Sequence, residues 1–383
     1  MSNTKDRTIQ ISEPVTGKEE LDALSVPLET GWLTQGPKVK EFEYEFANKH
    51  STKYAFATTS CTTSLHLALS SIGIRPGDEV IVPAFTWVST ANVVVYCGAK
   101  PVFVDVRADT YNIDVEKIKD NISFKTKAII PVHLFGLCAD MDEIKSSLPR
   151  NVKVIEDAAC AVGASYKSRM SGSLGDFGAF SFHPRKIITT GEGGMLTTND
   201  INLAEKAEIL RNHGASISEE KRHLGAKPYL LPDFDVLGYN YRMTDLQGAV
   251  GLAQLNKLDN FLTERKKWAR WYLDEISDIP WIKLPHFSQE FDHSWQAFVV
   301  VINEDNSPLS RNEIMEKLLE AGISTRPGTH AVSNLGYYRE KFSTKKSDFP
   351  VATMLENCSL ALPLHNKMEA EDFEYISKII HSI

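Results

Sequence analysis

The first two thirds of the chain alternate between short apolar runs and segments with helical spacing, and this alternation limits the possible folds more than any other feature. The apolar runs predict strands at 54–57, 80–83, 101–104, 128–132, 152–155, 177–182 and 194–197. Helical patterns lie between several of them, at 62–72, 86–96, 114–121 and 141–148. Nearly continuous apolar strands that alternate with helices predict an α/β fold, with a mostly parallel sheet covered by helices on both faces.

The last third of the chain has a different pattern. Residues 246–276 predict one long helix, rich in Leu, Ala, Lys and Glu. Beyond it we expect a strand at 295–302 and helices at 311–321 and 369–383, which together indicate a smaller α+β unit. We therefore predict two domains, a large α/β domain with the ligand-binding site (1–250) and a small C-terminal α+β domain (251–383).

Charge and composition argue against several classes of protein. The net charge of −8 disfavours sequence-independent binding to nucleic acid and binding to an anionic membrane. The five cysteines are widely spaced without a CxxC pair, so we expect neither a disulfide framework nor a metal site. The first residues are polar, and no apolar run approaches the roughly 20 residues of a membrane helix. We expect a cytoplasmic protein without a signal peptide or a membrane span.

Hydroxyl residues gather at 58–63, where one predicted strand ends and a helix begins. A helix N-terminus carries unpaired N–H groups and a positive dipole end, so it can bind an anion such as phosphate. Helix capping explains the same residues, because Ser and Thr are favoured at the start of any helix. The chain has neither a Walker A pattern nor GxGxxG, so a nucleotide loop is not indicated.

Two further strand ends carry candidate functional groups. Glu156 and Asp157 follow the run 152–155, where ligands of α/β sheets bind, although a carboxylate there can also cap the next helix. Trp87 follows the run 80–83 and offers a flat face to an aromatic ligand, or else it packs in the core.

Lys186 lies in SFHPRKIITTGEGGM (181–195), between a strand that Pro184 ends and a glycine-rich turn. Most lysines are solvated, but one that is held and partly desolvated can form a Schiff base with an aldehyde. An anion site, a carboxylate, an aromatic face and such a lysine together suit pyridoxal phosphate. The anion site would bind its phosphate and the carboxylate its ring nitrogen. The aromatic face would stack on its ring, and the lysine would react with its aldehyde.

These motifs resemble those of the DegT-type nucleotide-sugar aminotransferases, a branch of the fold-type-I pyridoxal-phosphate enzymes. EDAA (156–159), SFHPRKIITTGEGGM and GYNYRMTDLQ (238–247) carry the resemblance, which runs from residue 31 to residue 258 and continues more weakly to the C-terminus. It implies a large domain with a mostly parallel sheet flanked by helices, plus a smaller C-terminal α+β domain.

The resemblance also implies roles for single residues. It indicates Lys186 as the Schiff-base lysine and general base, Asp157 as the partner of the ring nitrogen, and His183 as a third catalytic residue. The cofactor contacts that it implies besides Lys186 and Asp157 are Thr62, Thr63, Trp87, Cys160, Ser181 and Asn240. Asn240 would reach the phosphate of the neighbouring subunit, so a homodimer is expected. The family usually has Gln or His at position 160, and because a thiol donates only a weak hydrogen bond, that contact is either lost or made by a water.

The implied reaction is a ping-pong transfer of an amino group, with pyridoxamine phosphate as the second form of the cofactor. The donor is L-glutamate, released as 2-oxoglutarate, and the acceptor is a nucleotide-linked 4-keto-6-deoxy sugar used in lipopolysaccharide or O-antigen biosynthesis. His183 within SFHPxK is more similar to members that aminate C4 than to those that act at C3. The candidate substrate contacts, each of which also has a purely structural explanation, are Thr34, Tyr241, Arg242, Arg326 and His330. The nucleotide stays open among UDP, dTDP and GDP.

Two other functions stay open. A pyridoxal-phosphate-dependent sugar dehydratase would have the same fold, but such relatives replace the lysine with histidine, and Lys186 argues against it. The other is a cofactor-binding regulator without turnover, which the net charge of −8 and the lack of a DNA-binding appendage in the sequence disfavour.

Overall fold

The computed structural model describes residues 8–216, 229 and 231–383. Its largest sheet has seven strands, in the order β1-β10-β9-β6-β5-β2-β4. They are β1 (Tyr54–Thr58), β10 (Gly194–Thr198), β9 (Phe177–Ser181), β6 (Lys153–Asp157), β5 (Thr126–Ile129), β2 (Glu79–Pro83) and β4 (Lys100–Val104). All of these strands except β10 point the same way, so the prediction of a mostly parallel sheet is confirmed.

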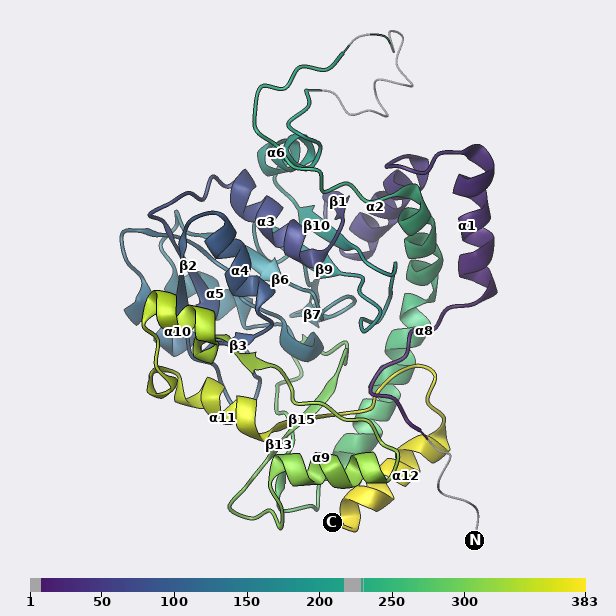
Figure 1. Ribbon diagram of the computed structural model, residues 1–383, viewed down its shortest axis with the longest axis vertical. Coiled ribbons are helices and arrows are strands. Elements are labelled where there is room, and N and C mark those ends of the chain that lie inside the picture. The colour runs from purple at the N-terminus through teal and green to yellow at the C-terminus, as the bar shows by residue number, and fades with distance from the viewer. Residues whose placement is uncertain (1–7, 217–228, 230) are drawn as a thin grey trace.

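Helices cover both faces of this sheet (Figure 1). One face packs against α3 (Cys61–Ser71), α4 (Ser89–Tyr96) and α6 (Ile201–Arg211). The other packs against α2 (Pro37–Lys49), α5 (Met141–Ser147) and the first half of α8 (Asp245–Glu275), with α1 (Lys18–Thr30) outside them. Alternate side chains of β2 show the two cores, because Val80 and Val82 lie in one and Ile81 in the other. Burial on both faces explains why the strands are almost continuously apolar.

A second, antiparallel sheet follows in the chain and orders β11 (Ile282–Lys283), β13 (Phe298–Ile302) and β15 (Ser359–Leu362). It packs with α9 (Arg311–Glu320), α12 (Ala370–His381) and the second half of α8, which runs along both sheets in Figure 1. Trp268 of α8 stacks on Phe373 of α12 with ring centroids 4.2 Å apart. The smaller α+β unit is thus confirmed, while the predicted domain boundary at residue 250 stays a prediction.

The chain returns to the large sheet between these elements. α10 (Gly336–Phe342) and α11 (Pro350–Cys358) pack into the core that holds β2 and β4. β14 (His330–Ala331) pairs with β3 (Phe85–Thr86), which follows β2. The remaining short elements are β7 (Ser165–Tyr166), β8 (Arg169–Met170), β12 (Phe291–Asp292), η3 (Leu134–Gly136), η4 (Val332–Asn334) and η5 (Lys346–Asp348). Part of the C-terminal third therefore lies beside the carboxyl ends of the parallel strands.

The structure corrects one predicted helix. Residues 114–121 form two 3₁₀ turns, η1 (Val115–Lys117) and η2 (Lys119–Asn121), because their N–H groups bond three residues back, as in Ile118 N–H to the Val115 carbonyl at 3.1 Å. The helix expected from residue 86 begins at Ser89, since Phe85–Thr86 form β3. Among the described residues, no helix is long and apolar enough to cross a membrane.

Candidate active site

Lys186 is held in a loop that joins β9 to the antiparallel strand β10. Its backbone N–H donates to the carbonyl of His183 at 2.8 Å, which forms the turn after Pro184. Thr190 N–H donates to the carbonyl of Phe182 at 3.0 Å and closes the loop above it. The partly buried Lys186 side chain then reaches Cys160, with 3.1 Å between Nζ and Sγ. Lys186 therefore points into the protein and does not extend into solvent.

Asp157 ends β6 and is almost completely buried. Thr90 Oγ1 donates to its Oδ2 at 2.7 Å, and the Ala159 N–H donates to its Oδ1 at 3.2 Å. The Cys61 thiol is a weaker donor, 3.9 Å from Oδ1. Burial raises the pKa of Asp157, although the hydrogen bond from Thr90 and the charge of Lys186 oppose this. The carboxylate thus has few donors for a buried anion and would be stabilised by a cationic partner.

The charges at this site interact with one another. Burial lowers the pKa of Lys186, but Cys160, Cys61 and Asp157 act in the opposite direction and hold this pKa above its ordinary value. In the free protein Lys186 is therefore an ammonium group at neutral pH. An amine that must attack an aldehyde has first to lose this proton.

The N-terminus of α3 lies beside β10 and β9. Ser60 caps the helix by accepting from the Thr63 N–H at 3.2 Å, and Thr63 Oγ1 accepts from the Ser60 N–H at 3.0 Å. A Cβ on Gly194 would lie 2.4 Å from the backbone carbon of Ser60, so only glycine allows this close approach. Ser181 is paired with Gly194 across the two strands. Thr62, Thr63 and Ser181 are thus brought to one place, at a helix end that suits a phosphate.

Trp87 lies at the open side of the site, with 57% of its surface exposed. Its ring centroid is 5.7 Å from that of His330, and the two rings are tilted by 43°. The pairing of β14 with β3 causes this proximity, because it places His330 opposite Thr86. The structure therefore joins one predicted cofactor contact with one predicted substrate contact.

Residues 239–242 lie beside the end of β1, where Arg242 bridges to Thr58. The ring of Tyr239 stacks on that of Tyr241 at 4.9 Å, and Tyr241 Oη lies 3.0 Å from Nδ1 of His66. Arg242 donates to the Asn212 side chain at 2.6 Å. Tyr239, Tyr241 and Arg242 therefore make contacts within the chain, whereas Asn240, between the two tyrosines, is exposed.

The other predicted residues lie as follows. His183 is partly buried, its Nδ1 accepts from the Arg185 N–H at 3.2 Å, and burial lowers its pKa, so the ring is neutral at pH 7. Thr34 is exposed, and its carbonyl accepts from the Asp245 N–H at 3.0 Å. Arg326 is exposed and pairs with Ala361 through its backbone. Within the described residues, no contact joins Thr34 or Arg326 to Lys186 or Asp157.

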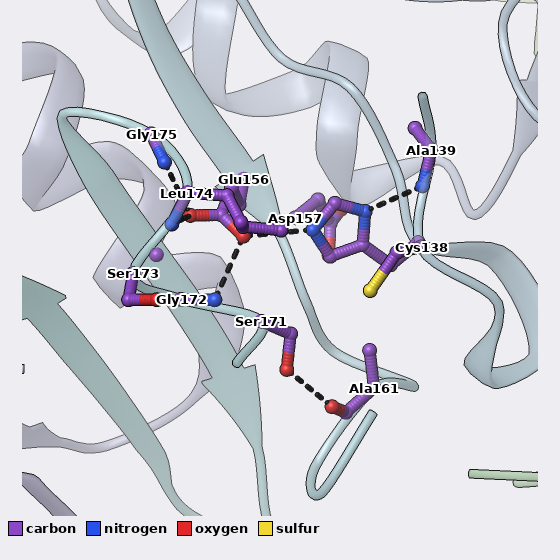
Figure 2. A network of polar contacts seen from close by, with 12 residues as sticks. Cys138, Ala139, Glu156, Asp157, Ala161, Ser171, Gly172, Ser173, Leu174 and Gly175 are labelled. Atoms are coloured by element: carbon purple, nitrogen blue, oxygen red, sulfur yellow. Dashed lines mark hydrogen bonds and ion pairs between the residues drawn. The ribbon is translucent and has the colours of Figure 1, made fainter. Parts of the chain in front are cut away.

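Sequence reasoning missed several residues that shape the site, among them Thr90 and His133. His133 lies beyond the end of β5. The Nε2 atom of His133 donates to the buried carboxylate of Glu156 at 2.8 Å. Figure 2 shows that the Glu156 carboxylate points to a tight loop, where it accepts from the N–H groups of Gly172, Leu174 and Gly175. The signal for His133 was its position, a polar residue directly after the apolar run 128–132. Because neighbouring residues of a strand point to opposite faces, Glu156 holds β6 against this loop, whereas Asp157 points to the opposite face, where the site lies.

The residues present fit pyridoxal phosphate. Lys186 could meet the aldehyde, the α3 N-terminus with Ser181 could hold the phosphate, and buried Asp157 calls for a cation such as a protonated ring nitrogen. The family model that matches residues 14–381 is that of the DegT/DnrJ/EryC1/StrS aminotransferases. The chain belongs to this family. The predicted family, fold and enzyme class are confirmed.

Similar proteins agree with this assignment. The spore coat polysaccharide biosynthesis protein SpsC from Bacillus subtilis is 39% identical over 100% of this chain and 99% of its own length. The aminotransferase from Psychrobacter cryohalolentis has a TM-score of 0.92 at 33% identity, over 97% of each chain. A protein assigned as a sugar aminotransferase from Streptococcus pneumoniae has a TM-score of 0.91 at 29% identity, over 98% of each chain. It was solved in a pyridoxamine phosphate form and in a pyridoxal phosphate form, so the predicted cofactor is confirmed.

Proposed function

We propose that this aminotransferase moves an amino group from L-glutamate to the C4 keto carbon of a nucleotide-linked 4-keto-6-deoxy sugar. The observation that carries the proposal is that the Lys186 amine and the buried Asp157 carboxylate lie close enough to influence each other's pKa, beyond the carboxyl ends of the parallel strands. Bound pyridoxal phosphate supplies the aldehyde that receives the amino group and a ring that takes up electrons.

Each residue of the site has a proposed part. Asp157 would pair with the protonated ring nitrogen, while Thr62, Thr63 and Ser181 would hold the phosphate. Lys186 Nζ is the group that can take a proton from the α-carbon of the donor and return a proton to the carbon that receives the nitrogen. Trp87, at the open side, would cover the cofactor ring and exclude water from it.

The site of amination rests on His183, which is neutral and lies three residues before Lys186. We place it beside the sugar, where an uncharged imidazole can donate or accept a hydrogen bond. His330 and Arg326 would contact the nucleotide diphosphate, and Thr34, Tyr241 and Arg242 the rest of the acceptor. His330 has the better support, since it lies against Trp87.

We also propose a homodimer, with Asn240 reaching the phosphate bound by the neighbouring subunit. The exposure of Asn240 between Tyr239 and Tyr241, whose rings stack within the chain, supports this, because its side chain is left for an outside partner. The name of SpsC, a spore coat polysaccharide biosynthesis protein, supports a product used in polysaccharide biosynthesis, and its use in lipopolysaccharide O-antigen stays a prediction. The cytoplasmic location stays a prediction.

A panel of nucleotide-linked sugars tests the proposal directly. The protein is incubated with glutamate and 3-keto or 4-keto sugars carrying UDP, dTDP or GDP. We expect 2-oxoglutarate and an amino sugar with nitrogen at C4, identified by mass spectrometry and NMR. Amination at C3 would contradict the position, and ammonia with a deoxygenated sugar would indicate the dehydratase.

A further inference from the structure

Thr90 makes the shortest hydrogen bond to the Asp157 carboxylate, 2.7 Å from Oγ1 to Oδ2. Thr90 lies in the first turn of α4, and both side chains are buried. An ionised carboxylate can only accept, so the Thr90 hydroxyl is the donor. A hydrogen bond to a charged, buried group is stronger than one between neutral groups.

A second hydroxyl group contacts Thr90. Thr86 Oγ1 lies 3.2 Å from Thr90 Oγ1, and Thr86 is also buried. Because Thr90 has a single hydroxyl hydrogen and gives it to Asp157, Thr86 must be the donor in this second contact. Thr86 belongs to β3, so a directed chain of hydroxyl groups runs from β3 through α4 to Asp157.

The two carboxylate oxygens of Asp157 are held differently. Oδ2 has the strong contact with Thr90, whereas Oδ1 has the Ala159 N–H at 3.2 Å and the distant Cys61 thiol at 3.9 Å. We propose that Thr90 is a positioning residue, which fixes the Asp157 carboxylate and stabilises its ionised form so that it can pair with the cofactor ring nitrogen. This inference rests on the proposed pairing of Asp157 with that nitrogen.

Substitution of the Thr90 hydroxyl tests the inference. Thr90→Val keeps the shape and removes the donor, and Thr90→Ser keeps the donor. The dissociation constant for pyridoxal phosphate is measured by absorbance titration of the full-length protein after its cofactor has been removed. We expect binding to be at least about 10-fold weaker in Thr90→Val, the lower end of the range for one hydrogen bond to a charged group, and near wild-type in Thr90→Ser.

Thr197→Val is the matched control, because Thr197 is buried and donates to the Gly172 carbonyl at 2.8 Å on β10, without a contact to Asp157. We expect this variant to keep the wild-type dissociation constant. Equal weakening in Thr197→Val and Thr90→Val would show general loss of stability and overturn the inference.

A double-mutant cycle separates the inference from the proposed function. In Asp157→Asn the cofactor should bind more weakly, and adding Thr90→Val should cause no further loss. An equal loss from Thr90→Val in both backgrounds would show that Thr90 does not act through Asp157 and overturn the inference alone. Wild-type binding by Asp157→Asn would overturn the proposed pairing, and the inference with it.

Discussion

At the scale of single residues, the site contains several ionisable groups that are largely buried. Lys186, Asp157, Cys61 and Cys160 influence one another, and the pKa values of Lys186 and Asp157 are both raised. A buried carboxylate with few donors costs stability unless a cation pairs with it directly. This shortage of hydrogen-bond donors favours a protonated ring nitrogen beside Asp157, so binding of the cofactor would remove the cost in stability.

The shortage of donors to the Asp157 carboxylate predicts how Asp157→Asn changes the stability of the fold. Because the pKa of Asp157 is raised, the folded protein binds this proton more tightly than the unfolded chain does. The ionised side chain therefore destabilises the cofactor-free fold above that raised pKa, and the penalty disappears below the ordinary aspartate value of about 3.9. We expect Asp157→Asn to raise the Tm of the cofactor-free protein at pH 7, and to raise it less as the pH falls. A lower Tm at pH 7 in scanning calorimetry would contradict this.

Cys160 predicts a second effect on the loading of the cofactor. Its sulfur, 3.1 Å from Lys186 Nζ, helps to hold the pKa of Lys186 above its ordinary value. Cys160→Ala should lower this pKa, so more of the reactive free amine exists at neutral pH. We expect the pH profile for reaction of the protein with pyridoxal phosphate, followed by stopped-flow absorbance, to move to lower pH. An unchanged profile would show that Cys160 does not control the lysine.

At the scale of elements, the contact between β10 and the start of α3 holds the predicted phosphate site. Gly194 allows it, and a Cβ there would lie 2.6 Å from the Cys61 backbone nitrogen. We expect Gly194→Ala to destabilise the protein by about 1–3 kcal/mol in urea unfolding, the range for overpacking, and to weaken cofactor binding. Gly336→Ala is the control, since nothing lies within 4 Å of its added Cβ. Similar behaviour of the two variants would contradict the assigned role of Gly194.

The sequence predicted the strands of the large sheet well, because burial on both faces makes each one a continuous apolar run. It also placed Asp157, Lys186 and the hydroxyl cluster, since each lies at the end of a strand. It did not single out Thr90, whose contact with Asp157 joins positions 67 residues apart. A hydroxyl near a helix start is too common for sequence to reveal such a long-range partner.

At the scale of the whole molecule, Asp105 ties the C-terminal third to the large sheet. Its carboxylate accepts from the N–H groups of Val351 and Ala352, at 3.1 and 2.9 Å, at the start of α11. We expect Asp105→Ala to cost about 1–2 kcal/mol, as for loss of a helix cap, and to increase hydrogen exchange in α11. Unchanged exchange in α11, measured by mass spectrometry, would contradict this role.

The same arrangement explains why the site was only partly predictable at this scale. Trp87 and His330 meet because β14 pairs with β3, and their positions in the chain differ by more than half of its length. Periodicity reveals the strands and helices, but it does not reveal which distant segments pair. The motifs that the family shares supplied that information for Lys186 and Asp157.

The proposed function requires Lys186 to bear the cofactor of this pyridoxal-phosphate-dependent aminotransferase. Borohydride converts an imine between a lysine and the cofactor aldehyde to a stable amine, which peptide mass spectrometry can locate. We expect the added cofactor mass on the peptide that carries Lys186, and no such mass in Lys186→Ala. A label on another lysine, or none on wild-type protein saturated with pyridoxal phosphate, would contradict it.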